Sequence, residues 1–240
     1  MPSWNLHLAH AQRLLESREP CLSGGIWDWE AFKLGSIAPD IYVGYMVHHP
    51  SRLISYEDTH MAETAVIPVP DQQRFLANYV EPLIASENLG DSQWVLEAGL
   101  SLGAWSHLTA DACYNELTRD YLSSRHLVPS QKLRKMKQDD FHLFGSTFLL
   151  GEDMELKPDS WLLKAACTFK PYALEAPDVK AACQVANRMV EQSRSALQEP
   201  GNYQLLDEEF FRQAFAATQN AIEAGLRWFA DEIARPDRVR

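Results

Sequence analysis

The feature that most constrains this chain is a long apolar segment that runs from residue 94 to about residue 122. Asp91 or Ser92 stands in front of it as a candidate N-cap, so the segment predicts a single long helix. His107 and Asp111 lie four residues apart in it, and this spacing places both on one helix face that is otherwise apolar. An imidazole and a carboxylate in a dry interior need either each other or a metal ion.

Further segments with helical spacing and capping residues flank this helix on both sides. They predict helices over about 3–17, 71–86 (kinked or split at Pro82), 129–150, 160–169, 177–198 and 207–234, with a short aromatic segment over 26–32. Loops are expected over 19–25, 41–56 and 151–158 and at Pro200–Gly201. We therefore predict an all-α protein with about seven or eight helices in a single domain spanning residues 1–240. Residues 1–150 would carry the metal site, and residues 151–240 would pack additional helices on it.

Composition and charge narrow the classes of partner. Hydrophobic residues make up 46% and charged residues 23% of the chain, which is enough for a sizeable core. The net charge of -11 argues against nucleic acid and against anionic membrane surfaces as partners. A phosphate-bearing substrate stays open, because a bound divalent metal ion can invert the local potential.

Cysteine usage and the N-terminal residues indicate the compartment. The four cysteines are scattered and form no CxxC pair, which favours reduced, mostly buried thiols. The residues from Met1 to His7 lack a basic start and a long apolar run, so we expect no signal peptide. No stretch approaches the roughly 20 apolar residues of a membrane helix. We expect a cytoplasmic protein without stable membrane insertion.

Taken one at a time, the polar candidate residues are weak evidence for a functional site. A His-xxx-Asp pair such as His107 and Asp111 is more often a plain hydrogen-bonded or surface pair. Asp40 follows Pro39, where an aspartate commonly serves a turn. His60 is predicted in the first turn of a helix capped by Asp58 or Thr59, which accounts for the polar residues around it. His7 and His10 are spaced i, i+3 on the first helix, and one of them is expected to be an ordinary histidine of an amphipathic face.

Taken together, these side chains indicate a metal site. Two carboxylates and two or three imidazoles form a reasonable ligand set for zinc or a similar divalent ion. Each would come from a different helix or helix end, which is how metal sites in helical bundles are built.

The order of these motifs resembles the zinc-dependent phospholipase C family, which is related to the zinc-dependent single-strand nucleases. The resemblance covers roughly the first 150 residues and rests on five short stretches: His7, Ala38–Tyr42, Thr59–Met61, Gly99–Leu102 and His107–Asp111. It implies a compact all-helical fold with up to three zinc ions. It also implies that Asp40, His60, His107 and Asp111 bind one zinc ion, while Asp111 bridges to a second ion that His7 also binds.

This chain departs from the family pattern at three places. Secreted members of the family use a processed N-terminal residue as a ligand, and this chain shows no processing signal. Asn115 is the polar residue nearest to where the family has a further histidine, and Asp139 with His142 partly replaces the HxxxE motif of the next helix. We therefore expect one or two ions, zinc first and manganese or iron as alternatives. The basic start of that helix is either a solvated charged face or a binding site for substrate phosphate: Lys132, Arg134, Lys135 and Lys137.

The resulting expectation is metal-dependent hydrolysis of a phosphomonoester or phosphodiester, on a soluble substrate or a phospholipid, with Asp40 as general base as well as ligand. Nearby polar side chains would accept hydrogen bonds from the outer nitrogens of the ligands: Ser106, Thr109, Asp58 and Glu63. One alternative is a non-catalytic binding or scaffold protein with a structural metal or none. Its C-terminal amphipathic helices leave a homodimer open. The other is a carboxylate-bridged di-iron bundle, since Glu57 and His60 have the Glu-x-x-His spacing.

Overall fold

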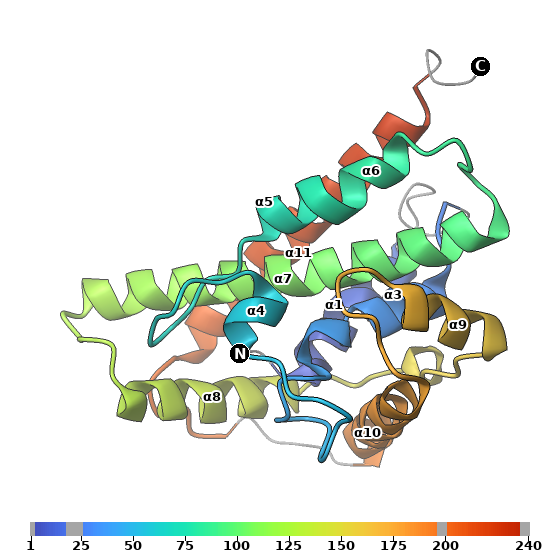
Figure 1. Cartoon of the computed structure of the whole chain (residues 1–240). Coiled ribbons are helices and arrows are strands. Elements are labelled where there is room, and N and C mark those ends of the chain that lie inside the picture. The colour runs from blue at the N-terminus through green and yellow to red at the C-terminus, as the bar shows by residue number, and fades with distance from the viewer. Residues whose placement is uncertain (1–2, 18–25, 196–200, 236–240) are drawn as a thin grey trace.

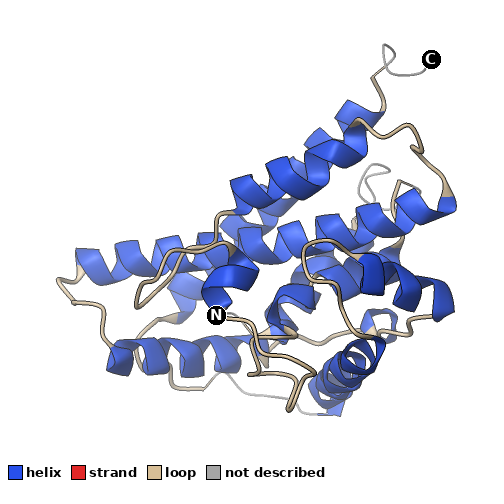
Figure 2. Cartoon of the chain, viewed as in Figure 1, coloured by secondary structure: helices blue, strands red, loops and turns tan. Residues whose placement is uncertain are grey.

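The computed structural model describes residues 3–17, 26–195 and 201–235, and every regular element within these ranges is a helix (Figure 2). The loop expected over 19–25 and the break expected at Pro200 fall outside the described residues. The elements are α1 (Trp4–Glu16), α3 (Trp29–Gly35), η1 (Ala38–Asp40), α4 (Tyr56–His60), α5 (Gln72–Phe75), η2 (Leu76–Val80), α6 (Glu81–Ile84), α7 (Ser92–Ser124), α8 (Gln131–Gly145), η3 (Glu152–Met154), α9 (Ser160–Thr168), α10 (Ala176–Ser195) and α11 (Glu208–Ile233).

The long helix α7 crosses the middle of the molecule, and the other helices are arranged around it (Figure 1). The Asp91 side chain caps it by accepting a hydrogen bond from the Trp94 backbone N–H at 2.7 Å. Its closest partners are α3 and α11, while α1 and α8 pack against each other beside it. Because α7 is covered on more than one side, nearly all its residues from 98 to 112 are buried, including the polar ones.

Two glycines set how closely α3 approaches α7. A Cβ on Gly103 would overlap with the carbonyl oxygen of Phe32, and a Cβ on Gly35 would overlap with that of Leu100. The backbones therefore touch directly, which no larger side chain would allow. This contact brings the end of α3 and the adjoining η1 against the middle of α7, where His107 and Asp111 lie.

The predicted helix boundaries are mostly confirmed, with three corrections. The helix expected to end at Leu150 ends at Gly145. The segment with Pro82 is not broken at the proline; it widens into the π-helical turn η2 just before it, since proline lacks the N–H that a regular turn needs. The short helix α4 ends at His60 instead of beginning there, because Ser55 caps it. Counting α5, η2 and α6 as one, the described residues form nine helices, where seven or eight were expected.

One hydrophobic cluster joins the N-terminal and C-terminal parts of the chain. Leu8 of α1, Leu108 of α7, Val190 of α10 and Phe229 of α11 all belong to it. Among the described cysteines Cys183 is buried, Cys113 is partly buried and Cys167 is exposed, so the expectation of mostly buried thiols was wrong for this part of the chain. None of the helices in the described ranges is long and apolar enough to span a bilayer.

Candidate metal centre

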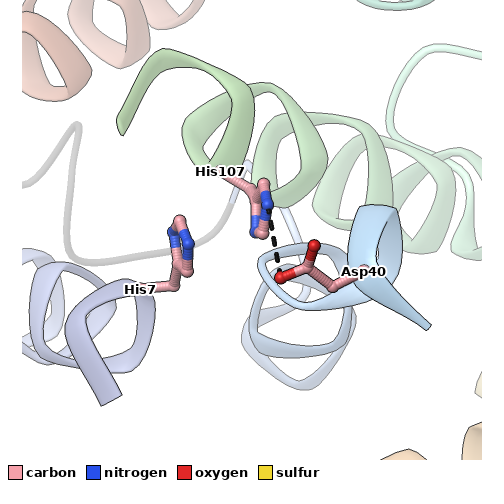
Figure 3. A group of neighbouring side chains, drawn as sticks. All are labelled: His7, Asp40 and His107. Atoms are coloured by element: carbon pink, nitrogen blue, oxygen red, sulfur yellow. Dashed lines mark ion pairs between the residues drawn. The ribbon is translucent and has the colours of Figure 1, made fainter. Parts of the chain in front are cut away.

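Five polar side chains from four separate elements meet in the interior, and none is more than 3% exposed. They are His7 of α1, Asp40 of η1, His60 at the end of α4, and His107 and Asp111 of α7. Figure 3 shows His7 and His107 with parallel rings and Asp40 pointing at His107. Potential ligand atoms of His7, Asp40 and His107, and those of His60, His107 and Asp111, lie within 4.8 Å of one another.

The outer nitrogens of two histidines determine which way their lone pairs point. His107 Nδ1 lies 2.8 Å from the Ser36 carbonyl oxygen, which can only accept, so this nitrogen carries the proton. His60 Nδ1 lies 2.8 Å from Thr59 Oγ1, whose own hydrogen goes to backbone carbonyls of α4. Both rings therefore direct an Nε2 lone pair inward, and these two Nε2 atoms are only 3.1 Å apart. Two lone pairs at this distance repel each other unless a positive charge lies between them.

The carboxylate of Asp111 divides its two oxygens between different neighbours. Oδ2 accepts a hydrogen bond from Tyr56 Oη at 2.7 Å and lies 3.6 Å from His60 Nε2. Oδ1 has no hydrogen-bond partner in the described structure and lies 3.5 Å from His7 Nε2, which also has none. Burial by itself would raise the pKa of Asp111, but the three histidines around it hold that pKa well below its usual range. An ionised carboxylate with one oxygen toward each side has the geometry of a bridge between two ions.

Asp40 faces the two other histidines. Its Oδ1 lies 3.7 Å from His60 Nε2 and has no hydrogen-bond partner among the described residues, while its Oδ2 lies 3.8 Å from His107 Nε2. The indole Nε1 of Trp4 donates a 3.1 Å hydrogen bond to Oδ2 and fixes the carboxyl group. Burial raises the pKa of Asp40 to about 6. Asp40 also lines an open cavity, so it connects the buried cluster with the surface.

These residues fit a divalent metal ion. Ligands at about 2.0–2.1 Å from a tetrahedral ion lie about 3.3 Å from each other. His60 Nε2 lies 3.1 Å from His107 Nε2, 3.7 Å from Asp40 Oδ1 and 3.6 Å from Asp111 Oδ2, and His107 Nε2 lies 3.8 Å from Asp40 Oδ2. Burial lowers the pKa of His60 far below its ordinary value, and burial together with the charge of His107 lowers that of His7 to about 3. Neutral imidazoles and an ionised carboxylate are the forms that bind metal.

The other predicted ligands lie outside this cluster. Asn115 is buried one turn beyond Asp111, but its Oδ1 accepts from Lys137 Nζ at 2.6 Å and its Nδ2 donates to the Pro68 carbonyl at 2.7 Å. Asp139 pairs with Lys135 on the surface of α8, with 3.0 Å between Nζ and Oδ2. His142 is exposed and lies at the edge of the cavity that reaches Asp40. None of the three belongs to either group of candidate ligands among the described residues.

The groups that orient the ligands differ from those expected. The Ser106 and Thr109 hydroxyls are buried without a hydrogen-bond partner in the described residues, and Asp58 bonds to Ser55. The observed partners are the Ser36 carbonyl, Thr59, Trp4 and Tyr56. Sequence reasoning missed all four, although Trp4 precedes His7 by three residues and Tyr56 precedes His60 by four. On a helix, either spacing places the two side chains on one face.

The five buried side chains could hold a metal ion. A comparison of the chain with protein-family models, with curated proteins and with solved structures found no match.

Proposed function

We propose that this protein is a metal-dependent hydrolase of phosphoesters, with one or two zinc ions bound by His7, Asp40, His60, His107 and Asp111. One observation carries the proposal: the Nε2 atoms of His60 and His107 lie 3.1 Å apart in the interior, and oxygens of Asp40 and Asp111 lie 3.6–3.7 Å from His60 Nε2. Without a cation this arrangement would be costly, because buried polar atoms need partners.

The ligand types favour a catalytic site over a structural one. Structural zinc sites are mostly closed and rich in cysteine, whereas catalytic sites keep an open position and use histidine with a carboxylate. This cluster contains no cysteine, and Asp40 borders a cavity of about 490 Å³. Imidazole and carboxylate ligands suit zinc, with manganese or iron as alternatives.

One divalent ion balances the charge of the site, and a second ion would help it to attract phosphate. The two carboxylates contribute two negative charges, which one divalent ion would neutralise, while burial keeps His7 and His60 neutral. A second divalent ion would make the centre net positive and attractive to phosphate, despite the chain's charge of -11. Asp111, with one oxygen toward His60 and the other toward His7, is the residue placed to hold both.

The chain's own residues have distinct roles in the proposed reaction. A bound divalent ion supplies Lewis-acid chemistry, which acidifies water and neutralises charge that develops on a phosphoryl oxygen. Asp40 is the candidate general base: its Oδ1 has no hydrogen-bond partner in the described residues and it borders the cavity from which water enters. Trp4 holds the other oxygen of Asp40 and so keeps Oδ1 oriented. The Ser36 carbonyl and Thr59 hold the His107 and His60 rings.

The test is elemental analysis of the purified chain together with a panel of soluble phosphomonoesters, phosphodiesters and phospholipids. We expect about one or two zinc ions per chain, loss of hydrolysis with a chelator, and its return with zinc or manganese. A chain that binds no metal and hydrolyses none of the panel would refute the proposal. The di-iron alternative has less support, because Glu57 and Asp139 lie outside the buried cluster; iron with an oxo-bridge absorption band would reverse this judgement.

A further inference from the structure

Two cavities of the surface approach the metal centre from the side of α8. The larger, about 490 Å³, is lined by Asp40, and the smaller, about 280 Å³, by Tyr56, whose hydroxyl group bonds to Asp111. Arg134 and Tyr45 line both cavities, so the two are neighbouring parts of one depression. We call this depression the α8 cleft.

Among the basic residues at the start of α8, Arg134 is the one that lines the α8 cleft without a partner. Lys135 pairs with Asp139, Lys137 is buried against Asn115, and Lys132 is exposed and does not line either cavity. Arg134 is partly buried, and its guanidinium has neither a hydrogen-bond acceptor nor an ion-pair partner in the described parts of the chain. A partly buried cation without a counter-charge is a binding group for an anion.

The neighbourhood of Arg134 adds to its positive potential. Burial lowers the pKa of Lys137 to about 8, and the nearby charges of Arg134 and Arg119 contribute to the lowering. The acidic side chain that lines the smaller cavity, Glu57, makes no ion pair with Arg134. In a chain with a net charge of -11, this clustering of cations beside the carboxylates of the centre is a local exception.

We propose that Arg134 binds the phosphate oxygens of the substrate in the α8 cleft and holds the ester beside Asp40. This inference rests on the proposed phosphoester hydrolysis and names a binding residue for it. A guanidinium matches phosphate because its planar donors form two parallel hydrogen bonds to two oxygens.

The lining of the cleft also indicates the substrate class. Around Arg134 the larger cavity presents both polar and apolar side chains: Ser3, Gln131, Lys135, Gln138 and His142, together with Tyr45 and Met46. Such a lining offers hydrogen bonds to a polar alcohol, and a cavity of about 490 Å³ is too small to hold the acyl chains of a lipid besides its headgroup. The substrate is accordingly a small phosphoester with a polar organic part, such as a soluble ester or an isolated headgroup, instead of an intact lipid in a bilayer.

The experiment compares Arg134→Gln with Lys132→Gln, which removes the same charge from the same helix but outside the cleft. The probes are inorganic phosphate, measured by calorimetry, and bis(p-nitrophenyl) phosphate as a soluble diester. For Arg134→Gln we expect phosphate binding weaker by about 10- to 100-fold and a similar rise in KM, with the metal content unchanged. Lys132→Gln should change neither by more than about twofold, and Arg134→Lys should restore part of the loss because it keeps the charge without the paired donors.

Several results would overturn the inference. Unchanged phosphate affinity in Arg134→Gln, or an equal loss in Lys132→Gln, would show that Arg134 is an ordinary surface charge. Faster cleavage of phosphatidylcholine in vesicles than of soluble diesters would overturn the polar substrate class. A chain without metal or activity would refute only the proposed function, since phosphate calorimetry on the metal-free protein still decides whether Arg134 binds the anion.

Discussion

Two histidines three residues apart on α1 have opposite environments. His10 donates from Nδ1 to Gln219 Oε1 at 2.8 Å and accepts at Nε2 from Tyr114 Oη at 3.0 Å, so both of its nitrogens are satisfied. His7 is equally buried, but its Nε2 has no hydrogen-bond partner in the described structure and faces the Asp111 carboxylate. Burial of a polar group therefore does not identify a functional site. A functional site is identified by buried polar atoms that lack hydrogen-bond partners and converge from several elements.

Buried aspartates show the same contrast. Asp140 of α8 accepts backbone N–H bonds from Gln204, Leu205 and Leu206 at 2.7–2.9 Å, and so it anchors the segment before α11. Asp40 and Asp111 each keep one oxygen without a hydrogen-bond partner in the described residues. The first kind of aspartate stabilises the fold by itself, whereas the second kind needs a cation.

The largest effect on metal content is expected from replacing a residue of the buried cluster. His107→Ala should reduce the bound metal from one or two ions per chain to almost none and abolish hydrolysis, because His107 belongs to both groups of candidate ligands. His10→Ala should keep its metal and lose stability instead. Elemental analysis of both folded variants measures the difference. Equal metal content in the two would remove the distinction between the two histidines.

In the metal-free protein, replacing the two kinds of aspartate with asparagine should change the free energy of unfolding in opposite directions. Asp140→Asn should lower the free energy of unfolding by about 2–3 kcal/mol, because hydrogen bonds to a charged acceptor are lost. Asp40→Asn should raise it by about 1–3 kcal/mol at pH 8. Since burial raises the pKa of Asp40 from 3.8 to about 6, its contribution to stability is full below pH 3.8 and is lost as the pH rises through 6.

Urea unfolding of the metal-free proteins at pH 8 measures both changes, and the circular dichroism spectrum controls for the native fold. The Asp40→Asn protein should also fail to bind metal or to hydrolyse phosphoesters. A destabilised Asp40→Asn protein would mean that this carboxylate is satisfied without a cation, like Asp140.

Acid should destabilise the metal-free protein through His10, whose two ring nitrogens both have hydrogen-bond partners. Burial lowers the pKa of His10 from 6.5 to about 4, so its contribution to stability is present above pH 6.5 and is lost as the pH falls through 4. In that window the unfolded chain takes up a proton that the folded chain does not. His10→Gln should therefore show a shallower decline between pH 6.5 and 4 in urea unfolding; an unaltered slope would assign the decline to other groups.

The smallest effects are expected from two tyrosine hydroxyls. Tyr56→Phe removes the hydrogen bond to Asp111 but keeps the ring that stacks on His60, and metal affinity should fall by about tenfold. Tyr114→Phe removes the hydrogen bond to His10 and should cost about 1 kcal/mol of stability with no change in metal affinity. Competition with a metal-binding dye and thermal unfolding separate the two. Weaker metal binding in Tyr114→Phe would contradict the comparison.

Helical periodicity was sufficient to predict much of the fold and part of the candidate site. The spacing of His107 and Asp111 on a predicted long helix placed both on one buried face, as observed. His60 was assigned to the wrong end of its helix because Ser55, not Asp58 or Thr59, supplies the cap. A helix is capped by the side-chain oxygen that reaches a free backbone N–H. Ser55, Asp58 and Thr59 lie within five residues of one another and offer nearly equal choices.

The sequence by itself determined which segments are helical and which residue types are available, because spacing and capping act within a few residues along the chain. Only the tertiary structure decided that His7 faces the cluster while His10 does not, that the Ser36 carbonyl orients His107, and that Arg134 alone of its basic neighbours lines the α8 cleft unpaired within the described residues. These outcomes depend on contacts between segments up to about two hundred residues apart, such as His10 with Gln219. Close packing of α3 on α7 at Gly103 sets such distances, and no local pattern encodes them.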